Sequence, residues 1–182
     1  MDYFDTETID GLIVKYAYDS EADAPWDSFE GHGPVRRSNS VHTEQRSDKK
    51  PGERPLNNPC RGEYQFYYDW KSATQSARAD GWNAAPYDAP NRVQRAIQAD
   101  FDYLRGYIEN DWCYVGVIIT DTDGNDLGSL WGVETFKDYH REQAREMVAA
   151  CLEAKRVTWR KALREARERK YWALRGVETV GA

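Results

Sequence analysis

The sequence of 182 residues has few of the residues on which metal sites, disulfide scaffolds and nucleophilic enzymes depend. It contains only three cysteines and three histidines, and no C-x-x-C pair occurs. Cys60, Cys113 and Cys151 are far apart and odd in number. This pattern argues against a disulfide framework or a zinc site, and it favours a reducing compartment.

Long apolar runs are also missing. The longest one extends from Trp112 to Ile119, which is far too short to span a bilayer. The first ten residues, MDYFDTETID, are acidic and lack the apolar core of a secretory signal. We therefore expect no membrane partner and no signal peptide.

Sequence motifs of catalysis are absent too. The chain has no G-x-S-x-G, no glycine-rich phosphate loop and no cysteine close to a histidine in sequence. A triad assembled only in space would leave no such trace, so an enzyme stays open as an alternative. The pattern favours a binding protein without a cofactor.

Aromatic residues and unevenly spread charge are what the sequence does have. It contains seven Trp and twelve Tyr, residue types that fill cores and also dominate binding hot spots. Residues 151–182 carry nine basic and four acidic groups, a net charge of +5, and residues 1–150 carry 16 basic and 27 acidic groups, a net charge of −11. Phosphate would repel the acidic body, so general nucleic-acid binding is not favoured, whereas a basic protein surface would attract it.

Periodicity predicts two strands and a short helix in the first half. Residues 11–19 and 63–68 are typical of strands, and residues 70–79 of a helix capped by Asp69 and ended by Gly81. The polar stretch 36–62 is predicted to be a long loop with little regular structure.

The second half predicts an amphipathic helix over 93–108, because apolar residues recur there at steps of three and four. A covered strand over 112–120 follows, then a hairpin partner over 127–134, and finally a helix over 136–174. Thr135 and Asp138 resemble a capping box at its start. The order β-β-α-α-β-β-α predicts an α+β fold with a mostly antiparallel sheet and a long C-terminal helix. We expect an acidic body over residues 1–135 and a basic helix over 136–182, which is part of the same domain or an assembly arm.

The stretch PWDSFEGHGPV holds the first candidate site. Carboxylates and an imidazole close in sequence suit a divalent ion, and a metal-dependent hydrolase using Asp27 and His32 is one reading. A second set of ligands has no clear source, since His42 lies in the polar loop and His140 has no partner one helical turn away. The alternative is a turn in which Trp26 is buried and at least one glycine has a positive φ. The candidate ligands are Asp19, Asp23, Asp27, Glu30 and His32.

The segment DTDGND has the first three ligand positions of a calcium loop. Asp126 stands where that loop needs Gly, and Gly132 where it needs Glu. An ordinary hairpin turn is the better interpretation.

The basic helix has two further interpretations. Its arginines, interleaved with aromatic residues, could contact phosphates, or they could form a solvated face. At 39 residues the helix would overhang the body unless it breaks near residues 155–157. A dimer would cover the apolar stripe of its second half. The candidates for phosphate contact are Arg160, Arg164 and Arg167, and those for the dimer interface are Trp159, Leu163 and Ala166.

Four blocks of the sequence resemble a recurrent family of small bacteriophage proteins over roughly residues 12–134. They are PWDSFEGHG, KKPGERPL, YYDWKSATQSARADGWN and DWCYVGVIITDTDG with SLWGVE, in that order. The resemblance implies a phage origin and an infected bacterial cytoplasm. It implies no catalytic residues.

The leading hypothesis is a phage accessory protein that binds and modulates a host protein, with a restriction or CRISPR defence component as the favoured target class. The alternative is a nucleic-acid-binding phage protein that uses the basic helix. Exposed loops carry function more often than cores do, so the PWD…GHG and PGER loops join the helix as candidate partner-binding surfaces. Their candidate residues are Trp26, Asp27, His32, Glu53 and Arg54.

Overall fold

The computed structural model describes residues 2–28, 31–38, 49–57, 64–82 and 90–175. The chain forms two compact units. Unit 1 combines residues 1–19 with residues 114–182, and unit 2 is the continuous segment 20–113.

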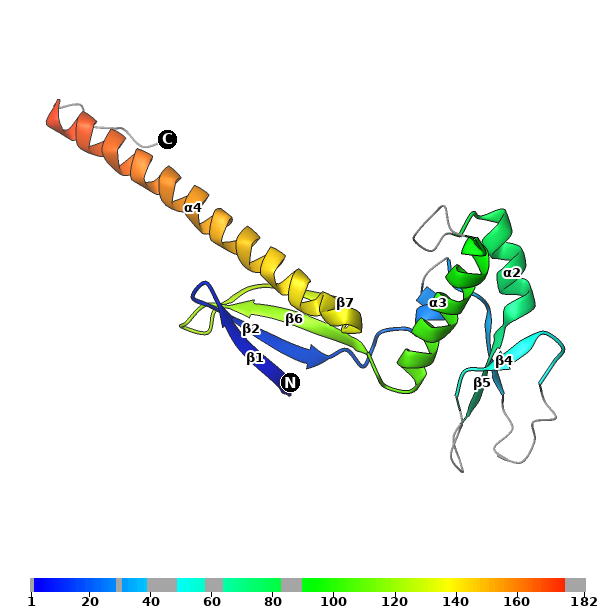
Figure 1. Ribbon diagram of the computed structural model, residues 1–182. Helices are drawn as coiled ribbons and strands as arrows, with labels where there is room; N and C mark the ends of the chain where they lie inside the picture. Colours follow the sequence, from blue (N-terminus) through cyan, green and yellow to red (C-terminus); the bar gives the residue numbers. More distant parts are fainter. Residues whose placement is uncertain (1, 29–30, 39–48, 58–63, 83–89, 176–182) are drawn as a thin grey trace. The chain divides into compact units, whose positions relative to one another are not determined.

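Unit 1 contains a four-stranded antiparallel sheet in the order β1-β2-β6-β7 (Figure 1). Asp10 and Gly11 join the first two strands with positive φ at both residues, as a tight hairpin with right-handed strand twist requires. The strands are β1 (Tyr3–Ile9), β2 (Leu12–Tyr18), β6 (Tyr114–Thr120) and β7 (Asp126–Glu134).

All seven residues of β6 are buried, which confirms the prediction of a covered central strand. Strands β6 and β7 pack against helix α4 (Tyr139–Leu174), which covers one face of the sheet. Tyr16 of β2 meets His140 of α4 edge-on, with ring centroids 5.2 Å apart. The rest of this core is mostly aliphatic, and it includes Val14, Val115, Val117, Ile119, Val133, Ala144 and Val148.

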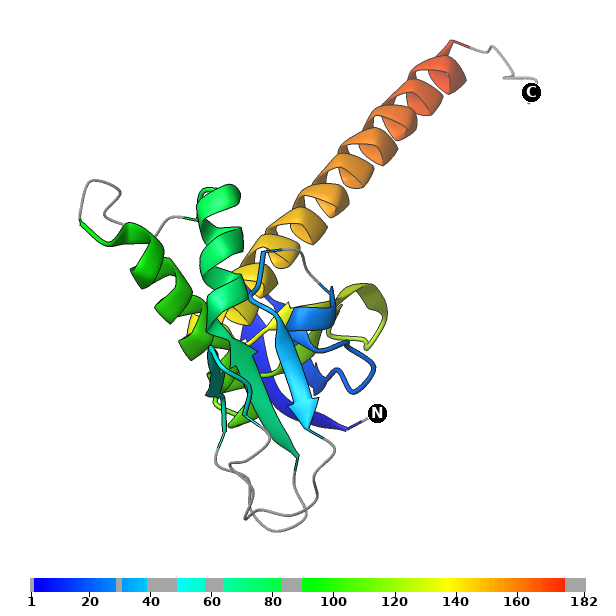
Figure 2. The same cartoon turned by 90° about the vertical axis from the view of Figure 1, so that its right-hand side faces the viewer.

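Helix α4 is one continuous helix of 36 residues, about 54 Å long at 1.5 Å per residue. It has no break at residues 155–157, and its second half extends beyond the sheet of unit 1 (Figure 1 and Figure 2). The predicted capping box was wrong: Thr135 makes no capping hydrogen bond, and residues Phe136–Asp138 form a 3-10 turn before the helix. Lys137 and Asp138 have positive φ there, so the chain bends before α4 begins.

Unit 2 contains a three-stranded antiparallel sheet, β3-β5-β4, and two packed helices. Tyr68 of β5 and Phe101 of α3 meet edge-on in its core. The buried residues around them are Leu56, Ala73, Ala77, Ile97 and Leu104. The elements are α1 (Pro25–Ser28), β3 (Val35–Ser38), β4 (Glu53–Pro55), β5 (Gln65–Asp69), α2 (Trp70–Ala79) and α3 (Arg92–Ile108).

The α+β fold, the mostly antiparallel pairing and the long C-terminal helix are confirmed. Helix α2 has the predicted bounds, Asp69 accepts a hydrogen bond from the Ser72 N–H as its cap, and Gly81 has a φ of 70°. Strand β1 was not predicted. The predicted loop 36–62 includes most of β3 and all of β4, while its residues 39–48 and 58–62 lie outside the described residues.

Among the described residues, every helix is too short or too polar to traverse a bilayer.

Candidate functional site

The first three sequence blocks lie in unit 2, where two carboxylates, Asp100 and Glu53, organise their loops. Asp100 lies on α3, and its side chain is only 8% exposed. One of its oxygens lies 2.6 Å from Nδ1 of His32. The other accepts the Gly33 N–H at 2.8 Å and the Tyr68 hydroxyl at 2.7 Å. A single carboxylate therefore fastens the GHG loop to both α3 and β5.

This arrangement limits the chemistry of the groups that surround Asp100. Burial, followed by the hydrogen bond to Asp100, raises the pKa of Tyr68 well above its usual range, so the phenol stays protonated as a donor. The His32 ring stacks on Tyr103 at 5.3 Å, with the two planes within 6° of parallel. The contact with Asp100 and the stacking on Tyr103 together hold the imidazole in one orientation.

The GHG loop needs its glycines for two different reasons. Gly31 has a φ of 114°, which side chains other than hydrogen rarely permit. At Gly33 a Cβ would lie 2.4 Å from the Tyr68 ring, so only glycine lets the loop reach Asp100. Trp26 is half-buried against Phe66 and Tyr107. The positive φ expected for this turn is confirmed, and Trp26 packs on the core as expected, although it is not fully buried.

Glu53 organises the PGER turn in a similar way. Its carboxylate is 6% exposed and accepts two hydrogen bonds from Arg36, each 2.8 Å long. It also accepts the Lys50 N–H at 2.7 Å. The hydrogen bonds from Arg36 hold the pKa of Glu53 below its usual range, against the opposing effect of burial. The turn is therefore fixed from inside by an ion pair between the buried Glu53 and the partly exposed Arg36.

Two exposed arginines lie against aromatic rings on the edge strands of this sheet. The Arg54 guanidinium lies 3.5 Å from the centre of the Trp70 ring, and Arg37 lies 3.4 Å from the centre of Tyr64. Arg54 follows Glu53 directly. The Arg36–Glu53 ion pair therefore also fixes the backbone position from which the Arg54 side chain extends. Stacked guanidinium groups of this kind are presented with less rotamer freedom than free ones.

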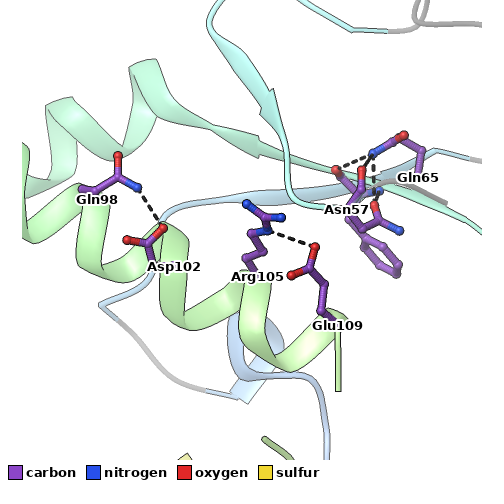
Figure 3. A network of polar contacts seen from close by, with 7 residues as sticks. Asn57, Gln65, Gln98, Asp102, Arg105 and Glu109 are labelled. Atoms are coloured by element: carbon purple, nitrogen blue, oxygen red, sulfur yellow. Dashed lines mark hydrogen bonds and ion pairs between the residues drawn. The ribbon is translucent and has the colours of Figure 1, made fainter. Parts of the chain in front are cut away.

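Polar contacts also lie within each of two flanks of the site, one beside β5 and one on α3 (Figure 3). The Gln65 amide donates to the backbone and side-chain oxygens of Asn57, and the Asn57 side chain accepts the Phe66 N–H. On α3, one-turn pairs join Gln98 to Asp102 and Arg105 to Glu109. These pairs leave the other side of α3, with Asp100, for the GHG loop.

The structure does not gather the candidate metal ligands. Asp19 belongs to unit 1 and accepts the Gly132 N–H at 2.9 Å, whereas His32 in unit 2 is bound to Asp100 and Asp27 is exposed. Glu30 and His42 lie outside the described residues. Within the described ranges, no three His, Cys, Asp or Glu side chains are grouped as a metal ion would need.

The DTDGND segment and His140 both have structural roles in unit 1. In the DTDGND segment, Asp121 accepts from the backbone N–H groups of Asp123 and Asn125 and from the Asn125 amide, so it forms the predicted turn. His140 is buried beside Tyr16, and burial lowers its pKa. It is a core histidine of unit 1.

The helical candidates lie on the overhanging half of α4, in unit 1. Trp159 is 65% exposed, Leu163 is half-buried and Ala166 is exposed. Arg160, Arg164 and Arg167 are exposed along the same half.

Sequence reasoning missed Asp100 and Arg36, which do the most to hold the site together. Asp100 did carry a signal. It lies three residues after Ile97 and four before Leu104, which places a carboxylate on the apolar side of the most regular amphipathic helix. A charge in that position calls for a buried partner.

Comparison of the chain with protein-family models, with curated proteins and with solved structures gives no match.

Proposed function

We propose that the chain is a small phage accessory protein that binds a bacterial host protein and changes its activity. The phage setting and the infected bacterial cytoplasm come from the four sequence blocks. A component of a defence system, such as a restriction or CRISPR effector, is the target class that we favour. A second copy of the chain is proposed separately, for α4.

The observation that carries this proposal is Arg54 stacked on Trp70, directly after Glu53 of the Arg36–Glu53 ion pair. The ionisable groups nearby serve the fold, since Glu53 is engaged by Arg36 and His32 by Asp100. Arg54 and Arg37 are instead exposed and held on aromatic rings. Arginine and aromatic residues dominate binding hot spots, and a fixed guanidinium suits carboxylates of a protein partner.

Affinity capture from host lysate with the full-length tagged chain tests this proposal. We expect one host protein to be enriched by the native chain and lost with Arg54→Glu. The matched control is Arg78→Glu, which makes the same charge change on an exposed residue of α2. A protein retained equally by both variants would place the contact elsewhere, and no enriched protein at all would contradict the proposal.

Nucleic-acid binding is the second candidate, and the exposure of Arg160, Arg164 and Arg167 on α4 favours it. Binding through these residues would weaken steeply with salt, because each phosphate contact releases counterions. The test is DNA affinity at several salt concentrations, for the native chain and for the variant with all three arginines changed to Glu. Equal affinities of the two chains would eliminate this candidate.

A further inference from the structure

Helix α4 continues its sheet-facing side beyond the end of the sheet. Ala144 and Val148 are buried on that side, and the Cys151 thiol approaches the Leu127 carbonyl oxygen at 3.8 Å. Steps of three and four residues along the same side then lead to Trp159 and Ala162, which are exposed. Because α4 does not bend back, the described residues of unit 1 leave this side open.

A groove of about 620 Å³ opens where α4 leaves the sheet. Leu127 at the start of β7 forms one wall, and α4 forms the other, with Trp159 and Lys155 also in the lining. Small residues follow one another along the helix here at a spacing of four. Such a row lets a second helix approach closely, in the packing class in which the i±4 rows of both helices interlock. The row consists of Ala150, Ala154, Thr158, Ala162 and Ala166.

The charges of unit 1 indicate which helix would bind in the groove. Residues 2–19 and 114–154 carry thirteen acidic and four basic residues, a net charge of −9. Residues 155–174 carry eight basic and two acidic residues, a net charge of +6. The straight helix directs its basic half away from its own acidic sheet (Figure 1). A second copy offers both an acidic body for that half and a complementary basic helix.

We propose that two copies of the chain associate through an antiparallel contact between their α4 helices, centred on Thr158. Thr158 is the middle of the row of small residues, so a two-fold axis there places Ala154 of each copy opposite Ala162 of the other. The contact is isologous and needs only one surface. A parallel pair would set two basic halves side by side, which like-charge repulsion opposes.

The antiparallel arrangement also accounts for the acidic turn beside the groove. Asp121, Asp123 and Asp126 lie within the six residues before Leu127. Hydrogen bonds from Asn125 lower the pKa of Asp121, and the Lys155 charge adds to this lowering. In the dimer, Arg164 and Arg167 of the second copy run past this turn. The exposed Trp159 of each copy is covered by the small residues of the other. The contact involves only residues of unit 1 from each copy. Its tests are therefore independent of the function proposed for unit 2.

Light scattering of the full-length chain at tens of micromolar is the first test. We expect the mass of a dimer, and the mass of a monomer for the variant Ala154→Arg with Ala162→Arg. Both positions are exposed on a helix, so circular dichroism should report the same helix content. The matched control is Ala149→Arg. Ala149 is exposed on the side of α4 opposite Thr158, so this variant should remain a dimer. A monomeric native chain, or a dimeric double variant, would overturn the proposal.

Disulfide trapping tests the direction and centre of the pair. In a background with Cys60, Cys113 and Cys151 changed to Ser, Thr158→Cys should give a cross-linked dimer on mild oxidation. Ala166→Cys in the same background should not, because only a residue near an antiparallel axis meets its own copy. Efficient cross-linking of Ala166→Cys would indicate a parallel pair, and failure of Thr158→Cys would remove the proposed centre. Either result would overturn the arrangement.

Discussion

Asp100 satisfies three donors from two separate segments: the Tyr68 hydroxyl on β5, and the His32 ring and Gly33 N–H in the GHG loop. A buried carboxylate is stable only when its oxygens are engaged in this way. Carboxylate, imidazole and phenol in one cluster resemble catalytic components, but here each one is used to close a loop onto a helix. This explains why the histidine stands between two glycines.

Gly33→Ala tests how tightly the GHG loop packs against the Tyr68 ring. The added Cβ would lie 2.4 Å from the Tyr68 ring, so the loop or the ring must move. We expect a loss of about 1–3 kcal/mol in the free energy of unfolding, as for an overpacked core. Denaturant unfolding measures it. The loss should shrink when Tyr68→Leu removes the ring, and an equal loss in both backgrounds would show that the ring is not the cause.

The contribution of Glu53 to the stability of the fold should depend on pH. Its pKa in the folded chain is below that of an unfolded glutamate, which is about 4.3. Its stabilising effect is therefore complete above that value and is lost as the pH falls through the lower, folded value. We expect Glu53→Gln to destabilise the chain by about 1–3 kcal/mol at pH 7.

Melting temperature measured from pH 3 to pH 7 checks this prediction. The difference between the native chain and Glu53→Gln should narrow at the acid end. Glu109→Gln, in the exposed pair with Arg105, is the control and should show little difference at any pH. A gap for Glu53→Gln that stays constant over the whole range would contradict the linkage.

At the scale of elements, sequence pattern succeeded where local signals were strong. Helix α2 has a side-chain cap and a terminating glycine, and β6 is a continuous apolar run. Strand β1 was missed because it is an edge strand, with the largely polar sequence YFDTETI and only partial burial. Strands β3 and β4 are four and three residues long and rich in arginine and proline, so only pairing with β5 defines them.

The same limit applies to the site. His32, Glu53 and Arg54 were found because they stand in unusual local motifs. Their partners Arg36 and Asp100 are 17 and 68 residues away from Glu53 and His32 respectively, and spacing alone cannot match such pairs.

Arg141 provides a prediction for how β1 is held. It bridges the first turn of α4 to β1 through Asp5 at 2.6 Å and Glu7 at 2.9 Å. All three groups are about one-third exposed, so solvent weakens the bridge, and we expect Arg141→Ala to cost only about 1 kcal/mol. The loss should be local, with faster hydrogen exchange in β1 and unchanged exchange in β6. Arg145→Ala, an exposed residue on the next turn, is the control. Equal acceleration in both strands would mean that β1 does not open separately.

At the scale of the whole chain, unit 2 is an insertion in a hairpin of unit 1. Strands β2 and β6 are antiparallel neighbours, with Tyr18 paired to Val115. The Asp19 N–H donates to the Tyr114 carbonyl oxygen at 3.0 Å, so the two ends of the inserted segment 20–113 are adjacent. A two-residue turn closes strands that end in this way.

The last prediction follows from this topology. Replacing residues 20–113 by Asn-Gly should leave unit 1 folded, because its core consists of residues from β2, β6, β7 and α4. The excised segment 20–113 should fold too, around the cluster that contains Tyr68 and Phe101. Each piece should show a cooperative thermal transition and dispersed amide resonances. The comparison chain is the first piece with Val117→Asp, a charge placed in the middle of β6, which should be unfolded because a buried charge has no partner there. If the first piece unfolds without that change, the two units depend on each other and the insertion is not autonomous.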